Sequence, residues 1–121
     1  MAIKKVLVVE DSPTDQKYLT DILVKKGYEV ATAESGEEAL VKARQLQPDL
    51  VLMDIVLPGQ NGYQATRELS KDARTRHIPV IICSTKSQET DRVWGLRQGA
   101  KDYVLKPIEE ADLLAKIKAL G

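Results

Sequence analysis

The stretch that most constrains the fold is an apolar run, Leu50 to Met53, which ends in the carboxylate of Asp54. Its residues do not alternate with polar ones, and unbroken runs of this kind are typical of strands covered on both faces of a parallel sheet. An ionised carboxylate is rarely left at the end of a buried strand without a partner. Asp54 therefore either caps a loop or has a chemical role.

The rest of the chain repeats this pattern of apolar runs separated by amphipathic stretches. Because each parallel crossover needs a helix-length return, the alternation implies an α/β fold with a five-stranded parallel sheet and helices on both faces. The predicted strands are residues 3–9, 28–33, 49–54, 78–83 and 102–105; the predicted helices begin near residues 13, 36, 63 and 88, and a last helix closes the chain.

Several helices carry start signals and apolar faces. Ser12 can cap a helix whose first residue is Pro13, and Ser35 with Glu38 has the spacing of a capping box. The apolar residues at helical spacing are expected to face the core. These residues are Leu19, Ile22 and Leu23, then Ala39, Leu40, Ala43 and Leu46, then Val93 and Leu96, and finally Leu113, Leu114, Ile117 and Leu120, while Tyr63, Ala65, Thr66 and Leu69 indicate the third helix.

Polar residues follow four of the five predicted strands. In open parallel sheets the ligand site lies beyond the carboxyl ends of the strands. The residues at those ends are Glu10 and Asp11 after the first strand, Asp54 after the third, Ser84 and Thr85 after the fourth and Lys106 after the fifth.

This set of side chains is suited to phosphoryl transfer. Three converging carboxylates repel one another, and a divalent cation, Mg²⁺ or alternatively Mn²⁺, makes their approach tolerable. Lys106 and the Ser84 hydroxyl could contact phosphoryl oxygens while Asp54 attacks in line. A nuclease or phosphatase metal centre is the competing interpretation. Such a centre would need more acidic residues or a histidine as a base. The one histidine, His77, precedes the fourth strand and is therefore expected at the opposite edge of the sheet.

Composition narrows the class of protein. The 121 residues fit one domain, and 18 basic and 18 acidic residues give a net charge of zero, which argues against nucleic acid as a partner. The apolar run near the N-terminus is too short for a signal peptide or membrane span, so we expect a cytoplasmic protein without membrane insertion. The single cysteine, Cys83, excludes an internal disulfide and is expected to be a small buried hydrophobe.

Four motifs, taken in order, resemble response-regulator receiver domains of the CheY type from end to end of the chain. The resemblance implies one receiver domain over residues 1–121 with a flavodoxin-like fold and the strand order 2-1-3-4-5, for which CheY is itself a standard example. The motifs are Val9-Glu10-Asp11-Ser12, Met53-Asp54-Ile55-Val56-Leu57-Pro58-Gly59, Ser84-Thr85 and Gly99-Ala100-Lys101-Asp102-Tyr103-Val104-Leu105-Lys106-Pro107.

The resemblance also implies roles for the residues of the site. Glu10, Asp11, Asp54 and the backbone carbonyl of Val56 would hold the metal. Asp54 would become a 4-aspartylphosphate, with Lys106 in contact with the phosphoryl group rather than standing as a solvated surface lysine. The phosphoryl donor would be a CheA-like histidine kinase or a histidine phosphotransfer domain. Such a protein is an autocatalytic acceptor and not a conventional enzyme.

Phosphorylation would then alter a docking surface. The resemblance implies that Ser84 moves toward the phosphoryl group and that Tyr103 follows it. These two movements would couple the site to the surface formed by the fourth helix, the fifth strand and the fifth helix. The alternative for Tyr103 is an edge-strand aromatic that packs on the fourth helix. Trp94 is expected to lie partly exposed near this surface, the alternative being a buried core residue. The Lys106–Pro107 bond is expected to be cis.

Residues 54–67 and 85–95 are similar to PilH-type receivers, which serve chemotaxis-like systems that control type IV pili in twitching or phototaxis. We expect a monomer, and because the chain ends just after the last helix, its output is expected to be the docking of a downstream protein. A phosphate sink for a sister regulator and a receiver-shaped scaffold that never takes phosphate are the alternatives. Val56 and Lys86, two residues beyond Asp54 and Ser84, predict slow self-dephosphorylation, because an apolar side chain cannot orient water.

Overall fold

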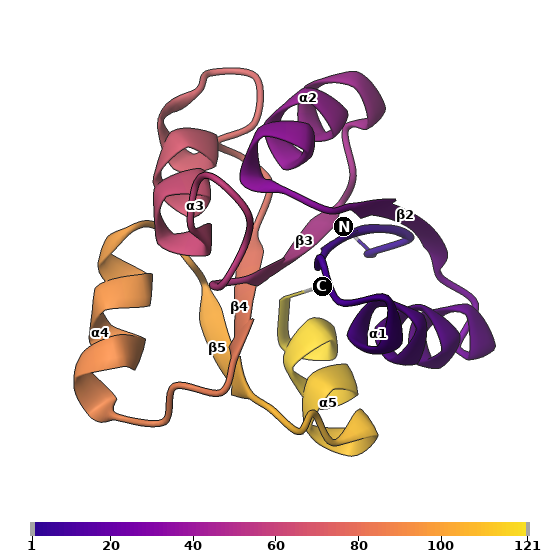
Figure 1. Cartoon of the computed structure of the whole chain (residues 1–121). Coiled ribbons are helices and arrows are strands. Elements are labelled where there is room, and N and C mark those ends of the chain that lie inside the picture. Colours follow the sequence, from indigo (N-terminus) through magenta and orange to yellow (C-terminus); the bar gives the residue numbers. More distant parts are fainter. Residues whose placement is uncertain (1, 121) are drawn as a thin grey trace.

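The computed structural model describes residues 2–120 and contains one parallel sheet with the strand order β2-β1-β3-β4-β5 (Figure 1). The α/β fold and the order 2-1-3-4-5 are thereby confirmed. The strands are β1 (Lys5–Val9), β2 (Glu29–Ala33), β3 (Leu50–Asp54), β4 (Val80–Ser84) and β5 (Asp102–Leu105). The helices are α1 (Pro13–Lys25), α2 (Gly36–Leu46), α3 (Gly62–Lys71), α4 (Glu89–Arg97) and α5 (Glu110–Leu120).

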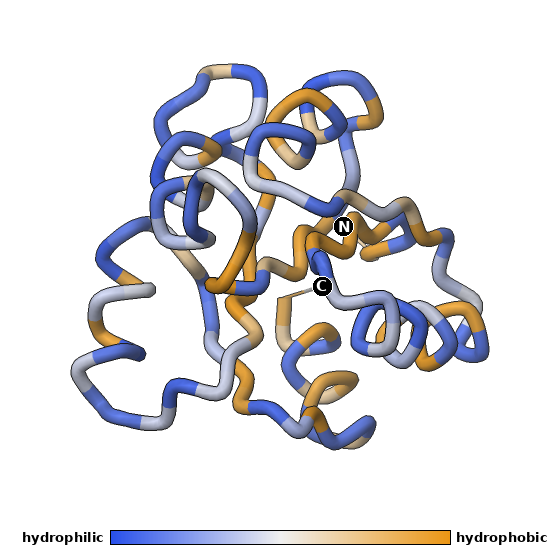
Figure 2. Tube along the Cα trace, in the orientation of Figure 1, coloured by the Kyte–Doolittle hydropathy of each residue, from blue (hydrophilic) through white to orange (hydrophobic). Residues whose placement is uncertain are grey.

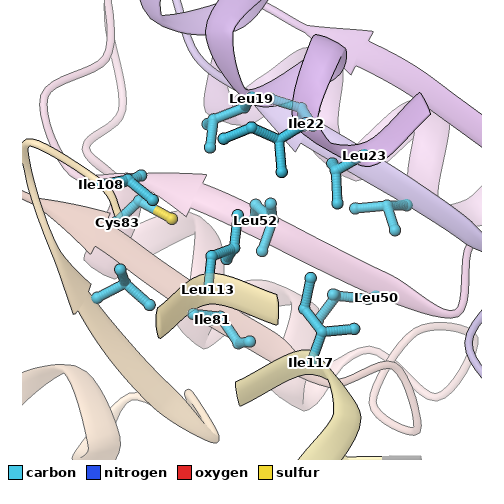
Figure 3. Close-up of a cluster of buried hydrophobic side chains, with 13 residues drawn as sticks. Leu19, Ile22, Leu23, Leu50, Leu52, Ile81, Cys83, Ile108, Leu113 and Ile117 are labelled. Atoms are coloured by element: carbon cyan, nitrogen blue, oxygen red, sulfur yellow. The ribbon is translucent and has the colours of Figure 1, made fainter. Parts of the chain in front are cut away.

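Helices cover both faces of the sheet, with α1 and α5 on one side and α2, α3 and α4 on the other (Figure 1). Successive residues of each strand point to opposite faces, so Val6 and Val8 pack toward α1 and α5 while Leu7 and Val9 pack toward α2 and α3. Figure 3 shows the first of these cores, in which Leu113 and Ile117 of α5 meet the sheet. Hydrophobic residues concentrate on the central strands (Figure 2).

The helix starts follow the predicted signals with two differences. Ser12 caps α1 and Pro13 is its first residue, as expected. Ser35 accepts the backbone N–H of Glu38, but the Glu38 carboxylate accepts from Glu34 and not from Ser35, so the reciprocal box predicted there does not form. A reciprocal capping box forms instead between Asn61 and Gln64, and α3 therefore begins at Gly62.

The predicted core faces are correct except in α2 and α4. Leu46 and Val93 are exposed, so these two expectations were wrong, whereas Leu96 is partly buried, as are Leu114 and Leu120 of α5. The only fully buried residue of α4 is Gly95. A Cβ there would lie 2.8 Å from Ile82 Cδ1, because the helix approaches the sheet more closely than a larger side chain permits. Among the helices between residues 2 and 120, none has the length and apolar character that a bilayer span requires.

Candidate functional site

The register of the parallel strands brings the predicted site residues to one edge of the sheet. Val9 pairs with Met53, so Glu10 and Asp54 follow at the same level. Beyond β4 and β5, the backbone N–H of Lys106 donates to the carbonyl of Ser84 at 2.8 Å. The carboxyl ends of β1, β3, β4 and β5 therefore meet as predicted.

Glu10, Asp11 and Asp54 form a compact carboxylate cluster in which one ligand oxygen from each lies within 4.8 Å of the others. Glu10 and Asp54 are buried, while Asp11 is exposed. Among residues 2–120, Glu10 Oε2 is one of the few buried side-chain oxygens without a hydrogen-bond partner. An all-oxygen donor set with a free buried oxygen fits a hard divalent cation such as Mg²⁺ or Mn²⁺.

The pKa of Glu10 also favours a cation at this carboxylate cluster. Burial, together with the adjacent Asp54 carboxyl, raises the pKa of Glu10 to about 8, although Lys106 acts in the opposite direction. Burial and a like-charged neighbour both disfavour the ionised carboxylate. A divalent cation in the cluster would reverse this balance and make the ionised form the stable one.

Lys106 is held among carboxylates and is not a solvated surface lysine. Its Nζ donates to Glu10 Oε1 at 2.6 Å and lies 3.3 Å from Asp54 Oδ1 and 3.2 Å from Asp15 Oδ2. Burial opposes its charge, but the hydrogen bond to Glu10 and the charge of Asp54 prevail and raise the pKa of Lys106. The side chain therefore stays an ammonium beside Asp54. The Lys106–Pro107 bond is cis, as expected.

Ser84 and Tyr103 both contact the backbone of the loop between β4 and α4. The buried Ser84 hydroxyl accepts the N–H of Lys86 at 3.1 Å, and the hydroxyl of Tyr103 donates to the carbonyl of Lys86 at 3.0 Å. Tyr103 is buried in a cluster with Ile82 beneath α4, so the packing on that helix that was the alternative for Tyr103 is present, and its role as a switch residue stays a prediction. The two side chains thus meet the same loop residue from different strands.

The remaining predicted residues lie at the rim of the site or outside it. Val56 is 69% exposed, and Trp94 is 51% exposed, which excludes the buried alternative for Trp94. Cys83 is buried, and burial raises the pKa of its thiol to about 12. His77 lies with Asp49 at the opposite edge of the sheet, as expected.

Two residues at the site were not predicted. Asp15, in the first turn of α1, adds a fourth carboxylate next to Lys106. Tyr63 of α3 donates its hydroxyl to the carbonyl of Asp91 at 3.2 Å and so ties α3 to α4. In the sequence, Asp15 is an acidic residue in the first turn of a helix, which is a common position for one. No sequence signal connects it with Lys106, which lies 91 positions away.

The sequence matches the family described as "Response regulator receiver domain" over residues 6–118. It is 57% identical to protein PilH of Pseudomonas aeruginosa over 116 residues, which is 96% of each chain. Both matches cover nearly all of the sheet and helices described above.

Solved structures agree with this likeness. The receiver domain of a Pseudomonas aeruginosa sensor histidine kinase, with a magnesium ion coordinated in its active-site cleft, superposes with a TM-score of 0.89 at 33% identity, over 98% of this chain and 97% of that one. The chemotaxis response regulator CheY4 of Vibrio cholerae superposes with a TM-score of 0.91 at 27% identity, over 99% and 100% of the two chains.

Proposed function

We propose, because this chain belongs to the response regulator receiver domain family, that Asp54 accepts a phosphoryl group from a histidine kinase or a histidine phosphotransfer domain. The observation that carries the proposal is the position of the Asp54 carboxylate. It stands between two further acids and an ammonium whose Nζ is 3.3 Å away. A carboxylate that attacks phosphorus, and the charged phosphoryl group that it accepts, require neighbouring groups of these kinds.

Glu10, Asp11 and Asp54, together with the backbone carbonyl of Val56, would hold Mg²⁺, and Mn²⁺ would suit the same oxygens. The unpartnered oxygen of Glu10 and the magnesium ion in the related kinase receiver support this assignment. When bound, the cation supplies positive charge that offsets the carboxylates and the incoming phosphoryl oxygens.

The side chains of the chain itself perform the transfer. A carboxylate oxygen of Asp54 attacks phosphorus in line, and the bond between phosphorus and the donor nitrogen breaks as the new oxygen–phosphorus bond forms. The ammonium of Lys106 contacts the transferred group, and the Ser84 hydroxyl donates to another of its oxygens. Later hydrolysis restores Asp54, so the chain is an autocatalytic acceptor and not a conventional enzyme.

The phosphoryl group acts as a switch through its contacts with one arrangement of the chain. If Ser84 turns toward the phosphoryl group, its hydroxyl no longer accepts the N–H of Lys86. The backbone of Lys86 is then less constrained, and the hydrogen bond from the Tyr103 hydroxyl to the carbonyl of Lys86 can break. Phosphate then favours the arrangement in which these contacts are made. The surface of α4, β5 and α5 changes with it and docks a downstream protein.

The likeness to PilH supports a role in type IV pilus motility for a monomeric, cytoplasmic regulator. A phosphate sink for a sister regulator is the alternative role. A sink must release phosphate quickly, and the apolar, exposed Val56 side chain cannot orient the water that hydrolysis needs. We therefore favour output by docking.

Incubation of the wild type with a small phosphodonor and Mg²⁺ is expected to add one phosphoryl group, which peptide mapping places on Asp54. Chelation of the metal is expected to abolish the addition, because the crowded carboxylates then lack their counter-charge. Intact-protein mass measures both. Continuous release of inorganic phosphate without an adduct would indicate a phosphatase-like enzyme, and a chain that never gains mass would be a scaffold.

Val56→Asn is expected to shorten the lifetime of the phosphorylated protein several-fold, since an amide at this exposed position can hold a water that Val56 cannot. The decay of the adduct after donor removal, followed by intact mass, measures the effect. Val41→Asn, at another apolar and exposed position, on α2, serves as the control. Faster decay in the wild type than in Val56→Asn would contradict the prediction of slow self-dephosphorylation.

A further inference from the structure

Asp15 brings a fourth carboxylate to the site from the first turn of α1. Its Oδ2 lies 3.2 Å from Lys106 Nζ, which in turn lies 3.3 Å from Asp54 Oδ1. One ammonium therefore stands between the carboxylate of the helix and the carboxylate proposed to accept phosphate. The Asp15 side chain is 46% exposed and that of Lys106 only 15%, so their contact lies at the mouth of the site.

Capping of α1 does not account for the direction of this carboxylate. The backbone N–H of Asp15 donates to Ser12 Oγ, which is ordinary capping, but the Asp15 carboxylate accepts from Lys106. Asp15 is also not a member of the three-carboxylate cluster that fits a cation. A cation held by that cluster would engage Glu10 and Asp54 and would leave Asp15 as the carboxylate still free to hold Lys106.

We propose that Asp15 is a positioning residue that draws Lys106 toward α1 and thereby limits phosphorylation of Asp54, an inference that rests on the proposed function. A phosphoryl group adds about two negative charges and needs the ammonium as a partner. Asp15 competes for that same ammonium and adds a like charge nearby. The unphosphorylated state gains the Asp15–Lys106 pair, and the phosphorylated state must weaken it.

Asp15→Asn tests this, because it keeps the shape of the side chain and removes its charge. At a fixed, sub-saturating concentration of a small phosphodonor with Mg²⁺, the ratio of phosphorylated to unphosphorylated protein is expected to rise roughly two- to fivefold, the size expected for a partly exposed charge pair. Intact mass gives the ratio. The difference from wild type is expected to shrink at high salt, since screening weakens partly exposed pairs.

Two matched variants separate this role from a structural one. Asp15→Glu keeps the charge and is expected to stay near the wild-type ratio. Asp21→Asn removes another α1 carboxylate, one that pairs with Lys17 at 3.0 Å, and is expected to change nothing. In a Lys106→Ala background the gain from Asp15→Asn is expected to fall, because the shared ammonium is gone. Thermal unfolding of each variant shows that it is folded.

A ratio in Asp15→Asn equal to or below that of the wild type overturns the inference, as does an equal rise in Asp21→Asn. An effect that persists unchanged in the Lys106→Ala background also overturns it, since Asp15 would then not act through Lys106. A wild type that takes up no phosphoryl group contradicts the proposed function itself. That failure is distinguishable, because every variant would then lack the adduct.

Discussion

Asp54→Ala is expected to take up no phosphoryl group under conditions in which the wild type takes up one. Glu10 and Asp15 are poor substitutes as acceptors. Glu10 is buried away from the solvent, and one of its oxygens already accepts from Lys106 at 2.6 Å. The Asp15 carboxylate is itself paired with the same ammonium, at 3.2 Å. Intact mass after incubation with phosphodonor and Mg²⁺ measures the loss.

The folding of Asp54→Ala is expected to be intact, because the substitution removes a like charge from the neighbourhood of Glu10. Without Mg²⁺, its midpoint of thermal unfolding is expected to equal or exceed that of the wild type. Mg²⁺ at about ten times its dissociation constant is expected to stabilise the wild type by about 1.4 kcal/mol and the variant by less. Asp72→Ala, which removes a carboxylate paired with Arg44 and Arg74 outside the site, is the control and keeps the adduct. An adduct on Asp54→Ala would contradict the assignment of the acceptor.

The fold and the position of the site could be predicted because few solutions exist for such a pattern. Apolar runs separated by amphipathic helices require a parallel sheet, and the strands of a parallel sheet end at one edge. Glu10, Asp54 and Lys106 therefore had to converge. The start of β4 differs from the prediction, since Ile78 and Pro79 continue its apolar pattern but precede the paired residues.

The features that could not be predicted depend on how closely elements approach one another. The periodicity of α4 pointed to Val93 as a core residue, but the helix buries Gly95 against Ile82 instead, and nothing local encodes that distance. Asp15 looks like any acid at a helix start, and its contact with Lys106 arises only when α1 and the end of β5 are placed side by side. Sequence patterns identify which residues share an edge, while tertiary packing decides which of them touch.

Gly62→Ala is expected to destabilise the protein by about 3 kcal/mol or more, a large share of the roughly 5–15 kcal/mol typical of a domain. The loop after β3 folds back so closely that the N–H of Gly62 donates to the carbonyl of Ile55 at 2.8 Å. A Cβ on residue 62 would lie 2.0 Å from the carbonyl oxygen of Asp54. Backbone atoms cannot turn aside as a flexible side chain can, so the strand end or α3 must shift. Denaturant unfolding measures the loss.

Gly27→Ala is the matched control, because it separates backbone strain from steric overlap. Gly27 has φ +92°, and no neighbouring atom lies within 4 Å of the position that a methyl group would occupy, so the cost is strain alone, about 1–2 kcal/mol. Gly62→Ala is expected to lose more than this and, in the fraction that remains folded, to accept phosphate more slowly, since the carbonyl it displaces belongs to Asp54. Equal unfolding free energies for the two variants would show that the loop yields easily. The acceptor would then not depend on the close contact between Gly62 and the end of β3.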